Sequence, residues 1–263
     1  MVLPDLTIPY MFIISTLIIF VIVIGRYFLI AGIFQLFFYR WQKLKWVNRR
    51  LSKKEVNKHQ FRKEIKWSLI TAFIFALTGT ITAILWQKGY TKLYITIDKY
   101  GWPWLPVSLL ISMLIHETYY YWLHRWMHKP LVFKIIHKTH HESNTTSAWT
   151  AFSFHPLEGL LQAIILPLIL IFLPMHISVF LLQLTLMTFS SVINHLEIET
   201  YPANFNKHII GKWIIGATHH SLHHKQFRYN YGLYFTLWDK VFKTESPKYH
   251  ELFKEKTNKT GEI

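Results

Sequence analysis

Three short segments of the sequence concentrate histidine at the spacing of helical turns. They read HRWMH at 124–128, HKTHH at 137–141 and HSLHH at 220–224. Histidines three or four residues apart lie on one side of a helix. Gathered imidazoles repel one another when protonated and need partners when buried and neutral, and a metal ion meets both requirements. The segments therefore predict a metal site with these ligands: His124, His128, His137, His140, His141, His220, His223 and His224.

The number of these histidines indicates more than one ion. Eight imidazoles exceed what one tetrahedral or octahedral ion can use, so two ions with four or five histidines each are expected. The chain has no cysteine, which excludes thiolate ligands and iron–sulfur clusters. The Glu and Glu-x-x-His pattern of soluble di-iron bundles is also missing. Imidazole suits iron, zinc, copper and nickel alike, so the pattern leaves the metal open.

Long apolar runs surround these segments. Of the 263 residues, 51% are hydrophobic and 16% charged, against about 25% charged in a typical soluble domain. The runs cover 11–38, 67–85, 104–123, 157–173 and 177–193. Only Pro174-Met175-His176 separates the last two, which predicts a helical hairpin. We expect an all-α integral membrane protein with about four spans, since a bilayer core of roughly 30 Å needs about 20 residues.

Positive charge predicts how the chain is oriented. The net charge is +15, and residues 40–66, between two apolar runs, hold eleven Lys or Arg against two Glu. The positive-inside rule and anionic lipids account for such a loop, so we expect a membrane and no nucleic acid as partner. With this loop in the cytoplasm, the three histidine segments and the C-terminus also lie on the cytoplasmic side. They would form a histidine-rich cap on a multi-pass protein.

Three domains are expected from this organisation. Residues 1–103 hold the N-terminal spans with the basic loop, and residues 104–244 hold the histidine segments. Residues 245–263 mix charges of both signs and are expected to be a solvated polar tail.

A longer series of motifs resembles the sterol desaturase / fatty acid hydroxylase superfamily of membrane di-iron oxygenases. In order, over about 112–244, they are HETYYYWLHRWMH, HKTHH, SFHPLE, NHLEIETYP and THHSLHHKQFRYNYGLYFTLWDKVFKT. The resemblance implies a four-span helical enzyme whose histidines hold two iron ions, with O2 as co-substrate. It implies hydroxylation or desaturation of a lipid. Electrons would come from a separate redox partner: a reductase, or a cytochrome b5-like or ferredoxin-like protein.

The resemblance also extends the set of candidate site residues. It adds His195 as a metal ligand, and it matches His155, which would be a ligand or a support for one. His116 and His219 are weaker candidates. His116 lies eight residues before His124, about 80° away around a helix, and is more simply a polar group that lines the bundle.

Three further polar residues have candidate roles. Asn230 and Asp239 could accept the free N–H of ligand histidines, or could cap local structure. Arg125 lies inside the first histidine segment and could pair with Glu142 or Glu158.

Two other kinds of protein stay open at this stage. A zinc-dependent membrane hydrolase would activate water with a nearby Glu, but its HExxH signature is absent, since Tyr120 stands where the second histidine would be. A non-catalytic metal- or lipid-binding membrane protein, such as a transporter, would place its ligands inside its spans. Most of the histidines here follow span ends instead.

Overall fold

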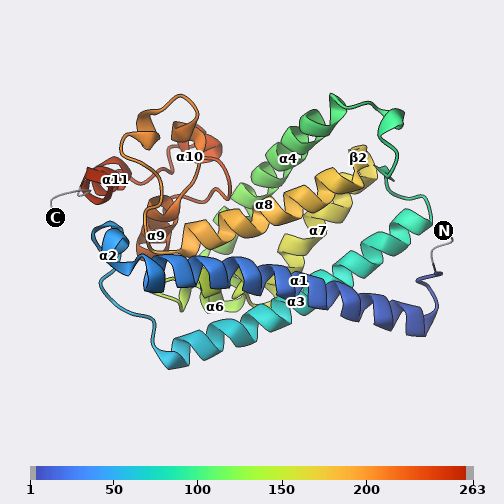
Figure 1. Cartoon of the computed structure of the whole chain (residues 1–263), viewed down its shortest axis with the longest axis horizontal. Coiled ribbons are helices and arrows are strands. Elements are labelled where there is room, and N and C mark those ends of the chain that lie inside the picture. The colour runs from blue at the N-terminus through green and yellow to red at the C-terminus, as the bar shows by residue number, and fades with distance from the viewer. Residues whose placement is uncertain (1–3, 259–263) are drawn as a thin grey trace.

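The computed structural model describes residues 4–258 as a bundle of long helices with a cap of short elements at one end (Figure 1). The long helices are α1 (Pro9–Leu36), α3 (Lys58–Gln87), α4 (Trp104–Met127), α7 (Pro156–Phe172) and α8 (Ile177–His195). A π-helical turn, Phe37–Trp41, extends α1. The all-helical prediction is confirmed apart from one pair of two-residue strands.

Three helices in the described residues are long and apolar enough to cross a membrane: Pro9–Trp41, Lys58–Gln87 and Ile177–His195. The predicted run at 157–173 forms the shorter apolar helix α7, of 17 residues. The run at 104–123 lies in α4, but α4 buries the polar side chains of Ser108, Ser112 and Glu117. Helix α4 is not among the helices that are apolar enough to cross a membrane.

The first two long helices pack in the manner of membrane helices. Outward-facing Leu17 and Val21 of α1 are more than half exposed, whereas Thr16 of α1 hydrogen bonds to Thr80 of α3 at 2.9 Å within the interface. The outward-facing side chains are apolar, and those between the helices are small or polar. This pattern suits a lipid environment, where close packing and hydrogen bonds hold helices together.

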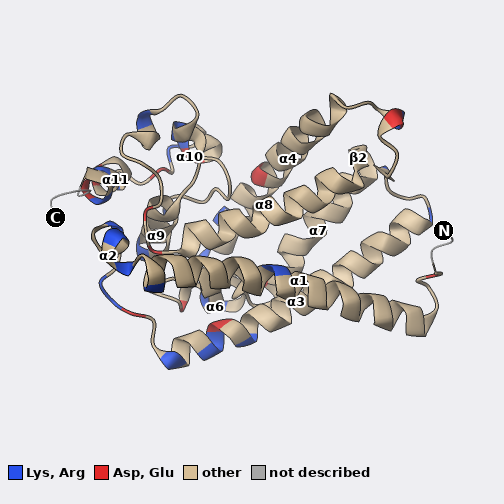
Figure 2. Ribbon diagram, in the orientation of Figure 1, with Lys and Arg blue, Asp and Glu red and all other residues tan. Residues whose placement is uncertain are grey.

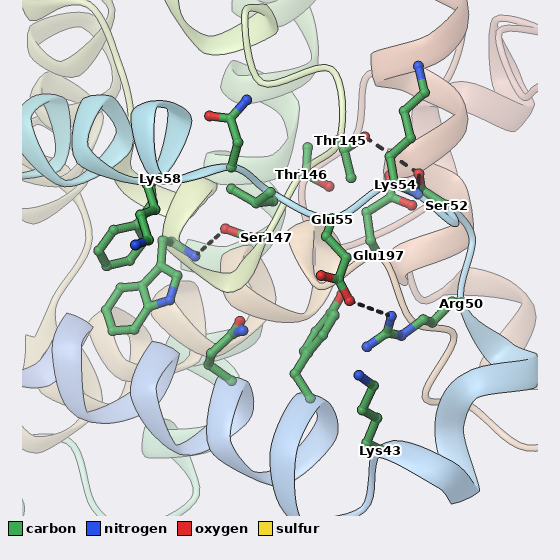
Figure 3. Close-up of a pocket in the computed structure, with 16 residues that line it drawn as sticks. Lys43, Arg50, Ser52, Lys54, Glu55, Lys58, Thr145, Thr146, Ser147 and Glu197 are labelled. Atoms are coloured by element: carbon green, nitrogen blue, oxygen red, sulfur yellow. Dashed lines mark hydrogen bonds and ion pairs between the residues drawn. The ribbon is translucent and has the colours of Figure 1, made fainter.

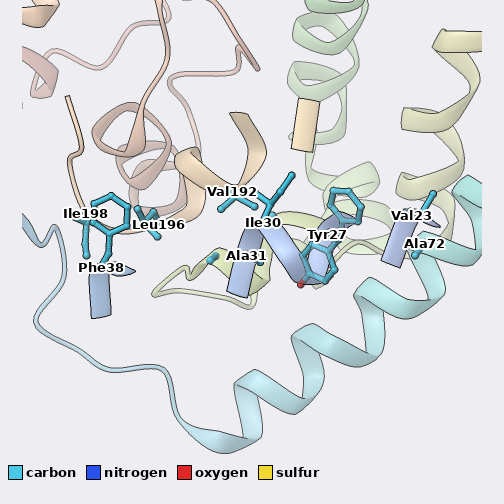
Figure 4. Close-up of a cluster of buried hydrophobic side chains, with 12 residues drawn as sticks. Val23, Tyr27, Ile30, Ala31, Phe38, Ala72, Val192, Leu196 and Ile198 are labelled. Atoms are coloured by element: carbon cyan, nitrogen blue, oxygen red, sulfur yellow. The ribbon is translucent and has the colours of Figure 1, made fainter. Parts of the chain in front are cut away.

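A buried cluster joins these helices to the rest of the protein (Figure 4). Tyr27 of α1 stacks on Phe152 with ring centroids 4.8 Å apart, and its hydroxyl donates to the Trp149 carbonyl at 2.7 Å. Val192 of α8 and Leu196 just beyond it belong to the same cluster. The N-terminal helices thereby hold the C-terminal end of α8, where His195 lies.

The predicted hairpin is present at the junction of α7 and α8. Between them, β2 (Met175–His176) pairs in parallel with β1 (Leu93–Tyr94), so that Leu93 aligns with Met175. The His176 side chain caps α8 by accepting from the Ser178 amide at 3.2 Å. The turn is therefore fastened to the loop that precedes α4.

The cap consists of short elements at the opposite end of the bundle (Figure 1). They are α2 (Lys43–Trp46), η2 (Val47–Arg49), α5 (Pro130–Val132), the π-helix η4 (Phe133–His137), α6 (Lys138–His141), η5 (Ala148–Phe152), η6 (Phe205–Lys207), η7 (Gly211–Trp213), α9 (Ala217–Gln226), α10 (Leu237–Val241) and α11 (Tyr249–Asn258); η3 (Ile97–Lys99) lies outside the cap, in the loop before α4. Tyr249 and Phe253 of α11 pack on Leu222 of α9. The predicted solvated tail is thus a packed helix up to residue 258, and 259–263 lie outside the described residues.

The basic segment lies at the same end as the cap (Figure 2). The Leu51 amide donates to the Glu197 carbonyl at 2.9 Å, and the Glu199 amide donates to the Arg49 carbonyl at 3.1 Å. These bonds attach the basic segment to the chain that follows α8. The Lys- and Arg-rich loop and the histidine segments therefore share one end of the molecule.

Candidate metal centre

Nine histidines gather into two groups in the described part of the chain. Within each group, one ring nitrogen per residue lies within 4.8 Å of all the others. The first group is His124, His128, His137, His141 and His223; the second is His140, His195, His220 and His224. These are the eight histidines of the three segments together with His195, so the structure brings together all nine predicted ligands.

Helix geometry decides which histidine joins which group. Residues four apart stay together: His137 with His141, and His220 with His224. Within each pair stands a third histidine, which is turned by about 100° around the helix from the histidine that follows it. His140 therefore joins the second group and His223 joins the first. Helices α6 and α9 consequently each contribute to both groups. The groups are adjacent, with the His141 and His224 rings 4.5 Å apart.

The backbone and one carboxylate fix the orientation of several rings. Nδ1 of His124 lies 2.9 Å from the Tyr231 carbonyl, and Nδ1 of His223 lies 2.7 Å from the Tyr229 carbonyl. The Ser191 and Ser153 carbonyls serve His195 and His140 in the same way. A carbonyl oxygen only accepts, so each Nδ1 must carry the proton and each Nε2 must hold a free lone pair.

These lone pairs face one another at short range. The Nε2 atoms of His124 and His137 are 3.1 Å apart, and those of His195 and His220 are 2.9 Å apart. Two such nitrogens repel unless a cation lies between them. Nitrogens about 2.1 Å from one ion and at right angles to each other would lie about 3.0 Å apart. The spacing and chemistry of both groups therefore fit a bound metal ion.

Burial keeps these imidazoles neutral. Burial first, and then the neighbouring His223 imidazole, lower the pKa of His128 to about 2. The same two causes, burial and adjacent imidazoles, hold the pKa well below its usual range in six more of the nine histidines, which are His137, His140, His141, His220, His223 and His224. Neutral imidazole is the form that binds a metal, so the cap is prepared for ligation at physiological pH.

Among the described residues, Glu158 is the carboxylate that contacts a histidine of the first group directly. Its Oε1 lies 2.8 Å from Nδ1 of His137, and both side chains are fully buried. Gln162 donates to the same oxygen at 3.1 Å. Sequence reasoning had considered Glu158 as a partner for Arg125. Arg125 instead lies near the Tyr121 hydroxyl and over aromatic rings, and Glu142 pairs with Lys63.

Asp239 and Asn230 support the centre through the backbone. Asp239 accepts from the amides of Tyr231 and Gly232 at 2.9 and 3.0 Å. Asn230, with φ of +61°, donates to the His219 carbonyl at 2.8 Å. Neither side chain contacts a ligand histidine in the structure, so the local-capping alternative describes them. They hold the loop whose carbonyls at 229 and 231 orient His223 and His124.

Glu117 of α4 also holds this part of the chain in place. Its carboxylate accepts from the amides of Leu233, Tyr234 and Phe235, the shortest at 2.7 Å. Glu117 directly follows His116 in the sequence, and no role was predicted for it. A carboxylate next to a histidine carries no signal that it will bind a loop more than a hundred residues away, and this support was therefore missed.

Three further candidates, His116, His155 and His219, lie outside both groups. His116 is buried and contacts the Tyr234 hydroxyl at 3.0 Å. His155 caps α7 through the Leu157 amide at 3.3 Å. His219 stacks on Tyr249 and pairs with Glu245 at 3.3 Å. Each has a structural partner, and none belongs to a group of metal-competent nitrogens.

A narrow, mainly apolar slot of about 20 Å³ adjoins the second group. Phe152, Phe154 and Leu233 line it, and His195 and His220 lie at its wall. It is too small for a lipid as it stands, so any lipid that enters must displace side chains.

The fold and the histidine groups define a helical protein of membrane type with a candidate two-metal centre at one end. A comparison with known families agrees. The profile of the fatty acid hydroxylase family matches residues 109–244, about half of the chain. The chain belongs to this family, within the sterol desaturase / fatty acid hydroxylase superfamily.

Curated relatives carry sterol-related names. The chain is 32% identical to "Delta(7)-sterol 5(6)-desaturase ERG3B" of Gibberella zeae over 69% of this chain and 55% of that protein. It is 29% identical to human "Lathosterol oxidase" over 70% of this chain and 60% of that protein. It is 33% identical to "Delta(7)-sterol-C5(6)-desaturase" of Nicotiana tabacum over 58% and 54%. The chain thus spans little more than half the length of these relatives. No solved structure matches it.

Proposed function

We propose that this protein is a membrane-bound di-iron oxygenase that hydroxylates or desaturates a lipid. The observation that carries the proposal is the convergence of nine imidazoles into two adjacent groups, with one ring nitrogen of each imidazole close to those of its group. Membership of the fatty acid hydroxylase family supports it, as do the names of the sterol desaturase and lathosterol oxidase relatives.

In this proposal the nine histidines hold two iron ions. Groups of five and four imidazoles exceed the three protein ligands of a catalytic zinc site, which favours iron over a zinc hydrolase. When bound, the iron pair would supply O2 reduction and oxidation of an unactivated C–H bond, with electrons from a separate redox protein. Five of the imidazoles have an Nδ1 partner that keeps the ring in one tautomer and one orientation. They are His124, His137, His140, His195 and His223.

The slot beside the second group is the proposed position of the reacting lipid carbon. Phe152, Phe154 and Leu233 would exclude water and orient an apolar chain or ring against the metal site. A sterol or a fatty-acyl chain meets these requirements equally.

The proposed orientation places the histidine groups in the cytoplasm. The basic segment shares their end of the molecule, and Lys/Arg-rich loops favour the cytoplasmic side. Tags inserted at residue 55 and at the C-terminus should report the same side, and a tag at residue 92 should report the opposite side. Opposite sides for residue 55 and the C-terminus would contradict this topology.

Lipid profiling by mass spectrometry tests the activity. Cells that express the wild-type chain should gain a lipid with one added oxygen or two fewer hydrogens, and iron content measured on the purified protein should approach two ions per chain. His140→Ala should remove the product and lower the iron content. His59→Gln, at an exposed histidine outside both groups, is the matched control and should behave as wild type. A product that persists in His140→Ala would refute the proposal.

A further inference from the structure

A second cavity lies in the cap, outside the histidine groups (Figure 3). It measures about 520 Å³, a size typical of ligand pockets. The end of α1, the basic segment and residues 145–149 surround it. Tyr39, Phe61 and Trp149 give it an aromatic wall. Four cations also line it: Lys43, Arg50, Lys54 and Lys58.

Arg50 is the cation that is held most firmly in the cavity. Its guanidinium lies over the Tyr39 ring at 4.7 Å, and its backbone bridges to Ile198. Its Nε is buried without a hydrogen-bond partner among the described residues. Glu55 is the nearest anion, but it lies 3.9 Å away on a side chain that is 75% exposed. Arg50 therefore presents an unfilled donor that an anionic oxygen could accept from.

The carboxylates at the cavity do not cancel its positive charge. Glu197 is buried, and its Oε1 accepts from Ser221 at 2.9 Å. Its Oε2 lies 3.6 Å from the ammonium of Lys225, which offsets its charge. Glu55 is the remaining carboxylate against the four cations. An anion that displaced Glu55 from Arg50 would meet lysines as well.

The neighbouring surface indicates that the anion belongs to a lipid. Trp41, Leu44 and Val47 are 68%, 82% and 45% exposed, and they alternate with Lys43 and Lys45 next to the end of α1. Exposed apolar side chains among lysines at the end of an apolar helix are typical of a segment that lies in the membrane interface. A headgroup in the cavity would leave its acyl chains free to run along the apolar outer face of α1.

We propose that this cavity binds the phosphate headgroup of an anionic membrane lipid. Arg50 and the lysines contact the phosphate, and the aromatic wall packs against the glycerol region. The lipid site is separate from the slot at the histidines. It does not depend on the reaction assigned to the metal centre.

The test uses the full chain, purified in detergent, and short-chain lipids as soluble probes. Dihexanoyl phosphatidylglycerol is titrated by calorimetry, beside dihexanoyl phosphatidylcholine and inorganic phosphate. The double variant Lys54→Gln/Lys58→Gln should bind phosphatidylglycerol at least about tenfold more weakly, since each cation near an anionic lipid contributes on the order of fivefold. Lys88→Gln/Lys92→Gln removes the same charge at exposed positions at the opposite end of the bundle and should bind as wild type.

Four outcomes would overturn the proposal. Equal affinity for phosphatidylcholine, whose choline cation cancels the phosphate charge, would show that the site does not select an anionic lipid. Inorganic phosphate bound as tightly as the lipid would assign the cavity to a soluble anion. An equal loss in the Lys88/Lys92 control would reduce the effect to overall charge. The last outcome is unchanged phosphatidylglycerol binding in two variants, Lys54→Gln/Lys58→Gln and Arg50→Gln, each with an unaltered melting temperature. It would place the lipid elsewhere.

Discussion

The contact between Glu158 and His137 gives a direct measure of how the protein tunes its proposed metal. A cation bound at Nε2 of His137 favours an ionised carboxylate at Nδ1. Glu158→Gln retains an acceptor of the same shape and removes the charge. A hydrogen bond to a charged group contributes about 1.5–3 kcal/mol, and a neutral one about 0.5–1.5 kcal/mol. The loss of about 1–1.5 kcal/mol predicts a roughly tenfold weaker iron site, since 1.4 kcal/mol is a factor of ten.

Glu158→Leu should have a larger effect because it leaves a buried Nδ1–H without an acceptor. Loss of such a partner typically costs about 10–100-fold in metal affinity. The assay is a competition between the purified protein and a chelator of known iron affinity, followed by elemental analysis. Glu251→Gln, at an exposed position on α11, serves as the control. Iron affinity equal to wild type in both Glu158 variants, with unchanged melting temperatures, would refute the role given to this contact.

Three further results are expected. The double variant His220→Ala/His224→Ala removes two proposed ligands of one group and should leave about one iron per chain by elemental analysis. The double variant His220→Ala/His223→Ala removes one from each group and should deplete both ions. Equal iron content in the two double variants would contradict the grouping. Gly232→Ala would place a Cβ 2.5 Å from the Phe235 carbonyl oxygen and 2.6 Å from the Ile215 side chain. The melting temperature of this variant should fall by the equivalent of about 1–3 kcal/mol. Gly25→Ala, with open space around the added Cβ, should melt as wild type. The stability of the metal-stripped protein should fall as the pH drops below about 6.5. In the unfolded chain His128 takes up a proton there, whereas in the folded protein its pKa of about 2 keeps it neutral. A melting temperature that stays constant between pH 7 and 5 would contradict this.

Much of the candidate site could be predicted from local sequence. Helical spacing brings His137 and His141 together, and the same holds for His220 and His224. The hairpin at 157–193 followed from two apolar runs and a joint too short for anything else. The tail was predicted less well, because the contacts of Tyr249 and Phe253 with α9 depend on a surface that the sequence does not display.

The sequence by itself indicated imidazoles as the candidate ligands and gave the positions of most long helices, because imidazole spacing and the length of apolar runs are local properties. The tertiary structure alone decided which segments meet, so that His223 joins the group of His124 and His128, and His195 joins the group of His140. It also decided that carbonyls at 191, 229 and 231 hold the rings, and that Asp239 and Glu117 hold the chain behind them. Every residue has a carbonyl, so only the packing of α4, α8 and α9 against the cap determines which carbonyls meet a histidine.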